Sequence, residues 1–296
     1  MSYQQGNPCY TKLMLAVLII FTSTLLQEAA ASIGKASVRK RRETVYSLAF
    51  LGVFWSLVFL IAAVALFGAE FRVEATSLAT LIPRIGLEII LAFIGAETIV
   101  KADRSTVGFL RLLTVPLLLL VDISLGYHLT VLQICGVLVM FVGLVIAFHH
   151  NPTGKKGAGL AIACAIISVV TVSLYKWDIS HYNSVAGEQI AVLMVMVLVF
   201  YLAARRSQAS PLKLLVSPLT GAQSLASGLS GAIEGFAYAF APASVILALK
   251  RTAALLWTIF FGRTYFHERS LIQKLHAGAW TSTGLFLLAS PYLAMH

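Results

Sequence analysis

Long apolar stretches alternate with short polar connections along the whole chain. A helix needs about 20 mostly apolar residues to cross the hydrocarbon core of a bilayer. Ten stretches approach this length, at residues 12–30, 46–69, 77–100, 107–124, 131–149, 158–176, 187–204, 222–240, 243–262 and 273–294. Because backbone groups in lipid must be hydrogen-bonded within their own segment, each stretch is expected to be helical. The pattern predicts an all-α integral membrane protein with ten transmembrane helices.

The composition excludes an ordinary soluble domain. Hydrophobic residues make up 59% of the chain and charged residues only 11%, whereas charged residues average about 25% in soluble domains. The net charge of +10 lies mostly in short connections, so it predicts membrane topology rather than nucleic-acid binding. The 3 cysteines are scattered, and they predict neither a disulfide framework nor a metal site. No cofactor is expected.

The first stretch has a second interpretation. Its polar start, its apolar run LMLAVLII and the small residues Ala29–Ala31 resemble a cleavable signal peptide. However, Lys35 just after this stretch has a counterpart in Lys176 at the end of the sixth stretch. The first stretch therefore belongs to a repeated pattern, and we expect it to be a retained helix.

A segment of the chain occurs twice. FLRLLTVPLLLLVDISLGYHLTVLQICG (109–136) is echoed by LKRTAALLWTIFFGRTYFHERSLIQKLHAG (249–278). Three pairs lie 140 residues apart, namely Arg111 with Arg251, Thr130 with Ser270, and Gln133 with Gln273. We predict two five-helix repeats, at 12–149 and 158–294, joined by a linker at 150–157. Because five is odd, the second repeat enters the membrane from the opposite side, as in many secondary transporters.

Basic residues predict the orientation. The odd-numbered connections, together with Lys274 at the margin of the ninth, hold fifteen of the 22 Lys and Arg residues, with the densest run at Val38–Arg42. The positive-inside tendency then places these connections in the cytoplasm and both termini outside. We expect a multi-pass protein of the cell (inner) membrane.

Charged residues inside the predicted spans are the candidates for function, since each costs at least about 2.5–3.5 kcal/mol at the centre of a bilayer. Glu88 and Glu234 lie about a dozen residues into their spans, near the midplane. The repeat brings Arg111 and Arg251 toward a central cavity from opposite sides. The predicted substrate-binding residues are Arg111, Lys250, Arg251, Glu88 and Glu234, with the deep aromatic residues Tyr238 and Trp257.

Several of these residues also have structural interpretations. Arg84 and Glu88 are four residues apart and are expected to pair on one helix. Glu234 is expected either to pair with Lys250 or Arg251 or to contact the substrate. For Tyr238 and Trp257, core packing is the alternative to stacking on a ligand.

Two further patterns concern the end of one predicted span and the packing of another. Tyr175 and Trp177 lie at a span end, where aromatic residues usually anchor a helix at the membrane surface. Small residues recur every four positions in the eighth span, at Ser227, Gly231, Gly235 and Ala239. Such a stripe permits close helix packing, and it could equally form a sliding surface or a cavity wall.

The repeated segments resemble the EamA-type, ten-helix members of the drug/metabolite transporter superfamily. The resemblance rests on the fourth helices, RLLTVPLLLL and RTAALLWTIF, and on the LxxxQxxG-like fifth helices. Glu268 occupies the acidic corner between them in the second repeat, whereas the first repeat has His128 there. The resemblance implies a ten-helix fold with cytoplasmic termini, which conflicts with the orientation predicted from charge.

Together these features predict a secondary transporter that moves a small organic solute, such as a metabolite, amino acid or drug, by alternating access. The excess of deep bases favours an anionic or zwitterionic substrate. We expect a monomer or homodimer in the lipid bilayer, with no nucleic-acid partner. A lipid-linked sugar flippase of the same fold, a channel and an integral membrane enzyme are the alternatives. Because the sequence has no DDxxD or HxxxH arrangement, an enzyme is not expected.

Overall fold

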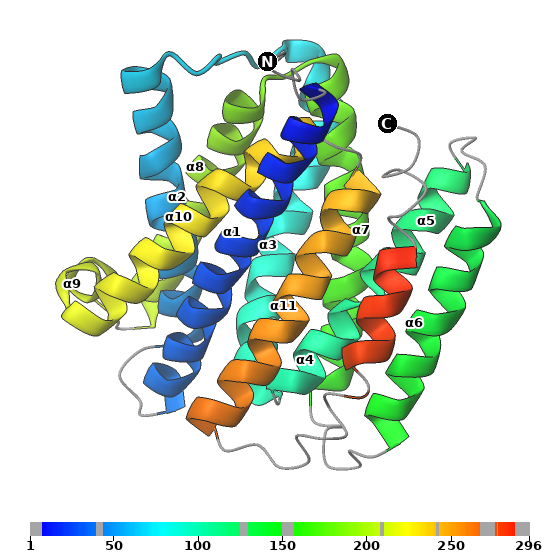
Figure 1. Cartoon of the computed structure of the whole chain (residues 1–296). Coiled ribbons are helices and arrows are strands. Elements are labelled where there is room, and N and C mark those ends of the chain that lie inside the picture. Colours follow the sequence, from blue (N-terminus) through cyan, green and yellow to red (C-terminus); the bar gives the residue numbers. More distant parts are fainter. Residues whose placement is uncertain are drawn as a thin grey trace, which may run out of the picture.

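The computed structural model describes residues 8–39, 44–102, 104–124, 130–149, 157–207, 210–240, 243–266, 276 and 278–287. Within these residues the regular structure is helical throughout, and no strand occurs. The elements are α1 (Pro8–Arg39), α2 (Val45–Phe67), the 3-10 turn η1 (Ala75–Ser77), α3 (Leu78–Lys101), α4 (Arg104–Arg111), α5 (Thr114–Ser124), α6 (Val131–His149), α7 (Ala158–His181), α8 (Val185–Arg206), α9 (Pro211–Val216), α10 (Pro218–Phe240) and α11 (Ala243–Phe266), followed by helical residues 278–287 (Figure 1).

Every predicted stretch is mainly helical over its described part, although α2 ends at Phe67, two residues before the predicted end, and the stretch at 107–124 is interrupted at Leu112 and Leu113. Five helices are long and apolar enough to cross a membrane, at Leu15–Val38, Val45–Phe67, Ala75–Lys101, Ala158–His181 and Val185–Arg206. The all-helical class is therefore confirmed, and the chain has the character of a multi-pass membrane protein. The count of ten spans and the kind of membrane stay predictions. The predicted linker falls, except for Gly157, outside the described residues.

The predicted helix at 107–124 is in fact two helices, α4 and α5. Near the break, the amides of Leu112, Leu113 and Val115 bond to carbonyls three residues earlier. Pro116 has no amide hydrogen to donate to the carbonyl of Leu112, and Thr114 Oγ1 donates to the Arg111 carbonyl at 2.7 Å. A proline close to the start of α5 therefore favours a new helix there instead of a continuous one.

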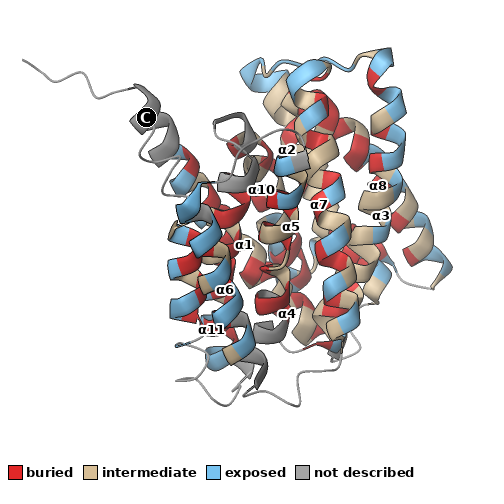
Figure 2. Ribbon diagram, turned by 90° about the vertical axis from the view of Figure 1, so that its right-hand side faces the viewer, coloured by how far each residue is buried: buried red, intermediate tan, exposed pale blue. Residues whose placement is uncertain are grey.

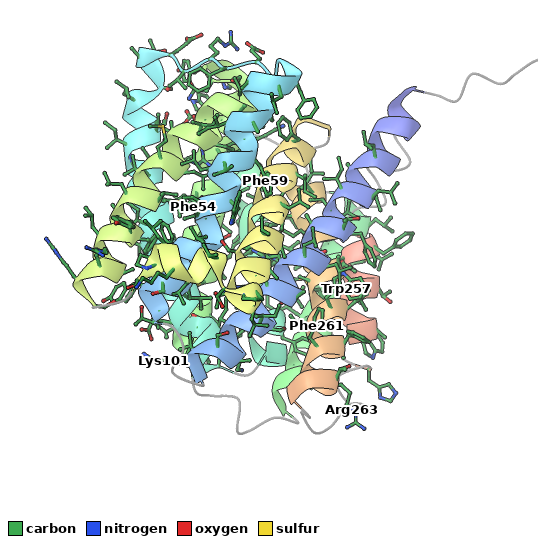
Figure 3. The ribbon with its side chains drawn as sticks, turned by 90° about the vertical axis from the view of Figure 1, so that its left-hand side faces the viewer. Phe54, Phe59, Lys101, Trp257, Phe261 and Arg263 are labelled. Atoms are coloured by element: carbon green, nitrogen blue, oxygen red, sulfur yellow. The ribbon has the colours of Figure 1, made fainter. Side chains whose placement is uncertain are left out.

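The connections alternate between the two ends of the bundle. The start of α1, the α2–α3 connection and the α7–α8 connection lie at the upper end in Figure 1. Lys101, at the end of α3, and Arg263, near the end of α11, lie at the opposite end (Figure 3). This alternation agrees with the predicted grouping of even and odd connections. Below, the two ends are called the α2–α3 end and the α1–α2 end.

The bundle has α1, α3, α7, α10 and α11 at its centre. α1 packs against α10 and α11, whereas α7 packs against α3 and α4. α2 packs against α8 and α10, and α4 packs against α11. Large apolar side chains also cover much of the outside, for example on α6, where Leu138 is 62% exposed and Val145 is 65% exposed (Figure 2). Lipid accounts for such a surface, whereas water does not.

Small residues allow α10 to approach α2 closely. Ser224 Oγ donates to the Leu51 carbonyl at 2.6 Å, and Ser227 Oγ donates to the Gly52 carbonyl at 3.0 Å. A Cβ atom at Gly228 would overlap the backbone of Trp55. Within the predicted stripe, a Cβ atom at Gly231 would overlap Ser56 Oγ, so the stripe serves close packing. Ser227, Gly231 and Gly235 also line the cavity described below, so the interpretation as a cavity wall holds as well.

Candidate functional site

A central cavity with two lobes lies among α1, α2, α3, α4, α7, α8, α10 and α11. The first lobe has a volume of about 270 Å³ and the second about 300 Å³. The two lobes share part of their lining, namely Gln27, Gly52, Val53, Leu91, Ser168, Ser227, Lys250 and Arg251. Helices from both predicted repeats supply these residues, so the cavity lies between the two predicted repeats.

The structure brings the five charged candidates together. Arg111 lines the first lobe, and Glu88 and Glu234 line the second. Lys250 and Arg251 line both lobes, although they are adjacent on α11. Residues distant in sequence therefore converge on one space, as expected for residues that contact one substrate.

Of the two aromatic candidates, Trp257 and Tyr238, the first lies outside the lining of the cavity. Trp257 is not among the residues that line the central cavity; it packs against Phe21, at 5.2 Å between ring centroids, and against Phe260. These two phenylalanines are 44% and 52% exposed, so Trp257 lies toward the outside of the bundle. Its position nearly two turns beyond Lys250 on α11 explains the separation. The side chain of Tyr238 lies outside the described residues.

Ion pairs join the helices around the cavity. Lys250 Nζ lies 2.6 Å from Glu234 Oε1, which confirms one of the predicted pairings. Arg111 Nη1 lies 3.6 Å from Glu28 Oε1, between α4 and α1. Arg251 Nε donates to Thr114 Oγ1 at 2.9 Å, beside the break between α4 and α5. The bases of the cavity are thus held by partners on neighbouring helices.

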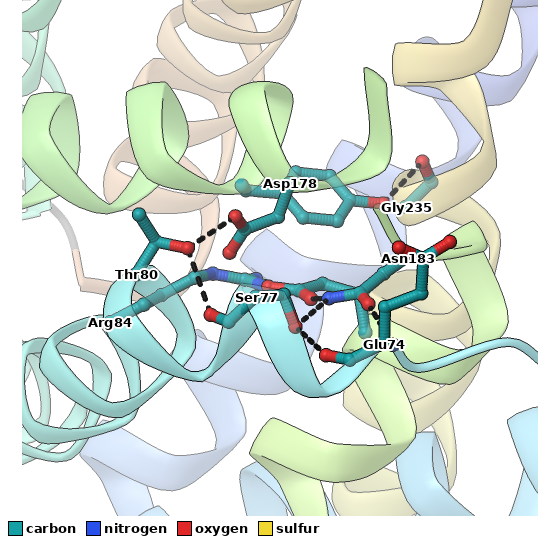
Figure 4. Close-up of polar contacts among 9 residues, drawn as sticks. Glu74, Ser77, Thr80, Arg84, Asp178, Asn183 and Gly235 are labelled. Atoms are coloured by element: carbon teal, nitrogen blue, oxygen red, sulfur yellow. Dashed lines mark hydrogen bonds and ion pairs between the residues drawn. The ribbon is translucent and has the colours of Figure 1, made fainter. Parts of the chain in front are cut away.

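The predicted pairing of Arg84 with Glu88 is wrong. Arg84 Nη1 instead contacts Glu188 Oε1 at 2.5 Å, across α3 and α8 (Figure 4). A carboxylate with no exposed surface requires a cation beside it, and Glu188 is 0% exposed. The arginine also lies 4.4 Å above the ring of Tyr175. Tyr175 itself is buried, and its hydroxyl donates a hydrogen bond to the Gly235 carbonyl at 3.2 Å. Its predicted role as an anchor at the membrane surface is therefore wrong.

Glu88 differs from the other acids of the cavity. It is half-buried and faces the second lobe. Within the described part of the chain, no Lys, Arg or His side chain lies at ion-pair distance from its carboxylate. A cationic group of a ligand, or a proton, could therefore reach this acid directly.

Several polar residues of the cavity were not predicted from the sequence. Gln27, Glu28 and Gln223 line the first lobe, and Gln189 lines the second. Glu28 could have been found, because it is an acid inside the first predicted stretch. The glutamines carry no charge, so they were not among the candidates, which were chosen as charged or deep aromatic residues inside the predicted spans. Among the described residues, no group of three or more His, Cys, Asp or Glu side chains is arranged to hold a metal ion.

Comparisons with known proteins support the fold alone. No protein-family profile matches the chain, and no curated protein matches it. A crystal structure of a protein with 16% sequence identity superposes with a TM-score of 0.67, over 96% of this chain and 99% of that one. A similar overall fold therefore occurs in a solved protein chain of nearly the same extent.

Proposed function

We propose that this protein is a secondary transporter, an EamA-type member of the drug/metabolite transporter superfamily, with ten transmembrane helices in two inverted repeats. It moves a small organic solute by alternating access. The central cavity carries this proposal, because acids and bases from both repeats meet there inside an apolar bundle. Buried charges of this kind usually mark a substrate pathway in a membrane protein.

The packing of the helices supports the inverted repeat. The repeats place α1, α2, α3, α4–α5 and α6 in correspondence with α7, α8, α10, α11 and residues 278–287. Under this exchange, the contact of α1 with α10 becomes that of α7 with α3, and the contact of α1 with α11 becomes that of α7 with α4. The pairs α2–α8 and α4–α11 each map onto themselves. A two-fold axis between the repeats requires this pairing.

The cavity also supports a class of substrate. Small-molecule sites usually measure about 300–1,000 Å³, and the lobes of about 270 and 300 Å³ together fall in this range. Arg111, Lys250 and Arg251 favour the anionic part of a solute, while Glu88 favours a cationic part. An anionic or zwitterionic metabolite fits this set of charges.

Counterflow in proteoliposomes tests the proposal. A thermal-shift screen of anionic metabolites, amino acids and lipophilic cations first selects ligands that raise the melting temperature of the purified protein. The selected solute is then expected to show saturable counterflow, and Arg111→Ala and Arg251→Ala are expected to lower it at least about tenfold by removing about 1.4 kcal/mol of binding.

Lys101→Ala is the matched control for the arginine variants. Lys101 is a base at the end of α3 whose side chain is 59% exposed, so counterflow should be unchanged. Unchanged counterflow in both arginine variants would rule out the assigned binding residues. A flux that rises linearly with concentration, without counterflow, would indicate a channel.

A lipid-linked sugar flippase of the same fold is the second candidate, favoured by one observation. An apolar cavity of about 470 Å³ lies among α5, α6 and α7, lined by residues such as Leu120, Leu138 and Ile166. These three side chains are exposed on the outside of the bundle, where lipid lies. Mass spectrometry of lipids extracted from the purified protein decides this case, because a flippase should retain a polyprenyl lipid.

A further inference from the structure

A buried polar layer closes the second lobe of the central cavity toward the α2–α3 end. We call this set the sealing layer; its buried members are Ser77, Arg84, Tyr175, Asp178, Asn183 and Glu188, and Thr80 is a half-buried member. Figure 4 labels Ser77, Thr80, Arg84, Asp178 and Asn183. The side chains come from α3, α7, α8 and the adjoining connections. Arg84 and Tyr175 line the cavity, and the other members lie beyond its lining.

The bonds of the sealing layer join three helices. The Arg84–Glu188 ion pair joins α3 to α8. Asn183 donates to the second carboxylate oxygen of Glu188 and, at 3.0 Å, to Ser77 Oγ. Thr80 Oγ1 donates to Asp178 Oδ1 at 2.5 Å, which joins α3 to α7. Every branch of this network crosses from one helix or connection to another.

The sealing layer excludes solvent and is tied to the surface above it. Ser77, Asp178 and Glu188 are each 0% exposed. Beyond them, the amide of Glu74 donates to Asn183 Oδ1 at 2.9 Å. The amide of Ser184 donates to the Arg72 carbonyl, also at 2.9 Å. The α2–α3 and α7–α8 connections are therefore fastened together over the layer.

The α1–α2 end is built differently. Along α3, the first lobe extends to Ile99, two residues and about 3 Å before the helix ends at Lys101. At the opposite end, the cavity stops at Arg84, six residues and about 9 Å inside the start of α3. Small apolar residues such as Ala31 and Ala96 line the cavity toward the α1–α2 end. One described polar bond there runs from Lys35 Nζ to the Ala102 carbonyl, at 2.6 Å.

We infer that Arg84 and Glu188 form the gate of the central cavity on the α2–α3 side, and that the structure is closed on this side. The inference rests on the proposed transport function, because alternating access requires each side to open in turn. A buried ion pair suits a gate, since both ions recover hydration when they separate and the pair adds little net stability. Loss of one partner instead leaves a buried charge without its counter-ion, which favours the open, hydrated arrangement.

Cysteine labelling from each face of the membrane tests the closed side. The reporter is Ser168→Cys, a half-buried position that lines both lobes, after Cys9, Cys135 and Cys164 are changed to serine. Phe71→Cys, 56% exposed in the α2–α3 connection, and Leu212→Cys, 53% exposed on α9, identify the two faces. A membrane-impermeant methanethiosulfonate reagent is expected to reach the reporter from the Leu212 face and not from the Phe71 face. Equal reaction from both faces, or reaction from the Phe71 face alone, would overturn the inference.

Gate variants test the two residues themselves. Arg84→Ala and Glu188→Gln are expected to increase labelling from the Phe71 face at least about tenfold, by shifting the population toward the open form. The charge exchange Arg84→Glu with Glu188→Arg should restore protection, and Lys101→Ala on the same helix should not alter it. Unchanged protection in both single variants, with normal melting and size-exclusion profiles, would refute the gate.

If the single variants do not fold, labelling of the parent protein still decides which side is closed. Labelling as expected without counterflow would refute transport and leave the seal in place.

Discussion

At the scale of single residues, the charges of this protein are held in pairs that cross between helices. Glu188 has no exposed surface, and its carboxylate accepts hydrogen bonds from Arg84 and Asn183. Lys250 and Glu234 are less enclosed, at 14% and 15% exposed, and both line the second lobe. The first pair therefore excludes solvent, whereas the second lies on the wall of the cavity, where the proposed solute would meet either partner.

Variants of the Lys250–Glu234 pair can distinguish an effect on solute binding from an effect on protein stability. Lys250→Met is expected to lower both the melting temperature and counterflow, because it leaves Glu234 buried without its cation. Adding Glu234→Gln should recover most of the melting temperature but not the counterflow, since the charges that meet the solute are still absent. A double-mutant cycle in both assays measures the coupling. Recovery of counterflow in the double variant would show that the pair is purely structural.

At the scale of helices, close packing of α2 with α10 forms one wall of the cavity. Ser56 Oγ donates to the Gly228 carbonyl at 3.1 Å, so the two backbones are joined through short side chains. Gly52 and Ser227 belong both to this contact and to the lining of the two lobes. The packing of α2 on α10 therefore also determines the shape of the cavity.

Gly228→Ala is expected to destabilise the protein. A Cβ atom there meets the backbone of Trp55 and Ser56, which cannot move aside as a flexible side chain can. Overpacking of this kind costs about 1–3 kcal/mol. Gly86→Ala on α3 is the matched control, because nothing lies within 4 Å of its added Cβ atom and alanine favours a helix by about 1 kcal/mol over glycine. Thermal melting in detergent should separate the variants, and equal loss in both would contradict the close contact.

At the scale of the whole molecule, the apolar pattern located the helices because span length and composition are local properties. The Lys250–Glu234 pair could be predicted because the two residues lie on consecutive spans. The Arg84–Glu188 pair could not, since the sequence offered Arg84 a nearer acid in Glu88 and contained no information on which helix packs beside α3. Trp257 was misplaced for another reason: it lies on nearly the same face of α11 as Lys250, but about 10 Å farther along the helix, and the sequence contained no information on how far the cavity extends.

The sealing layer has a consequence for the rates of flux. The pairing of helices is symmetric between the repeats, but the described polar network that closes the α2–α3 end is not matched by the small apolar lining toward the α1–α2 end. Under the proposed transport function, the inward-facing and outward-facing forms therefore resemble each other in helix arrangement but differ in free energy. The solute gradient alone determines the direction of net flow, yet an empty carrier would spend unequal times facing the two compartments. Inward and outward flux in oriented vesicles should then half-saturate at different solute concentrations, and equal values would indicate that the two closures have the same energy.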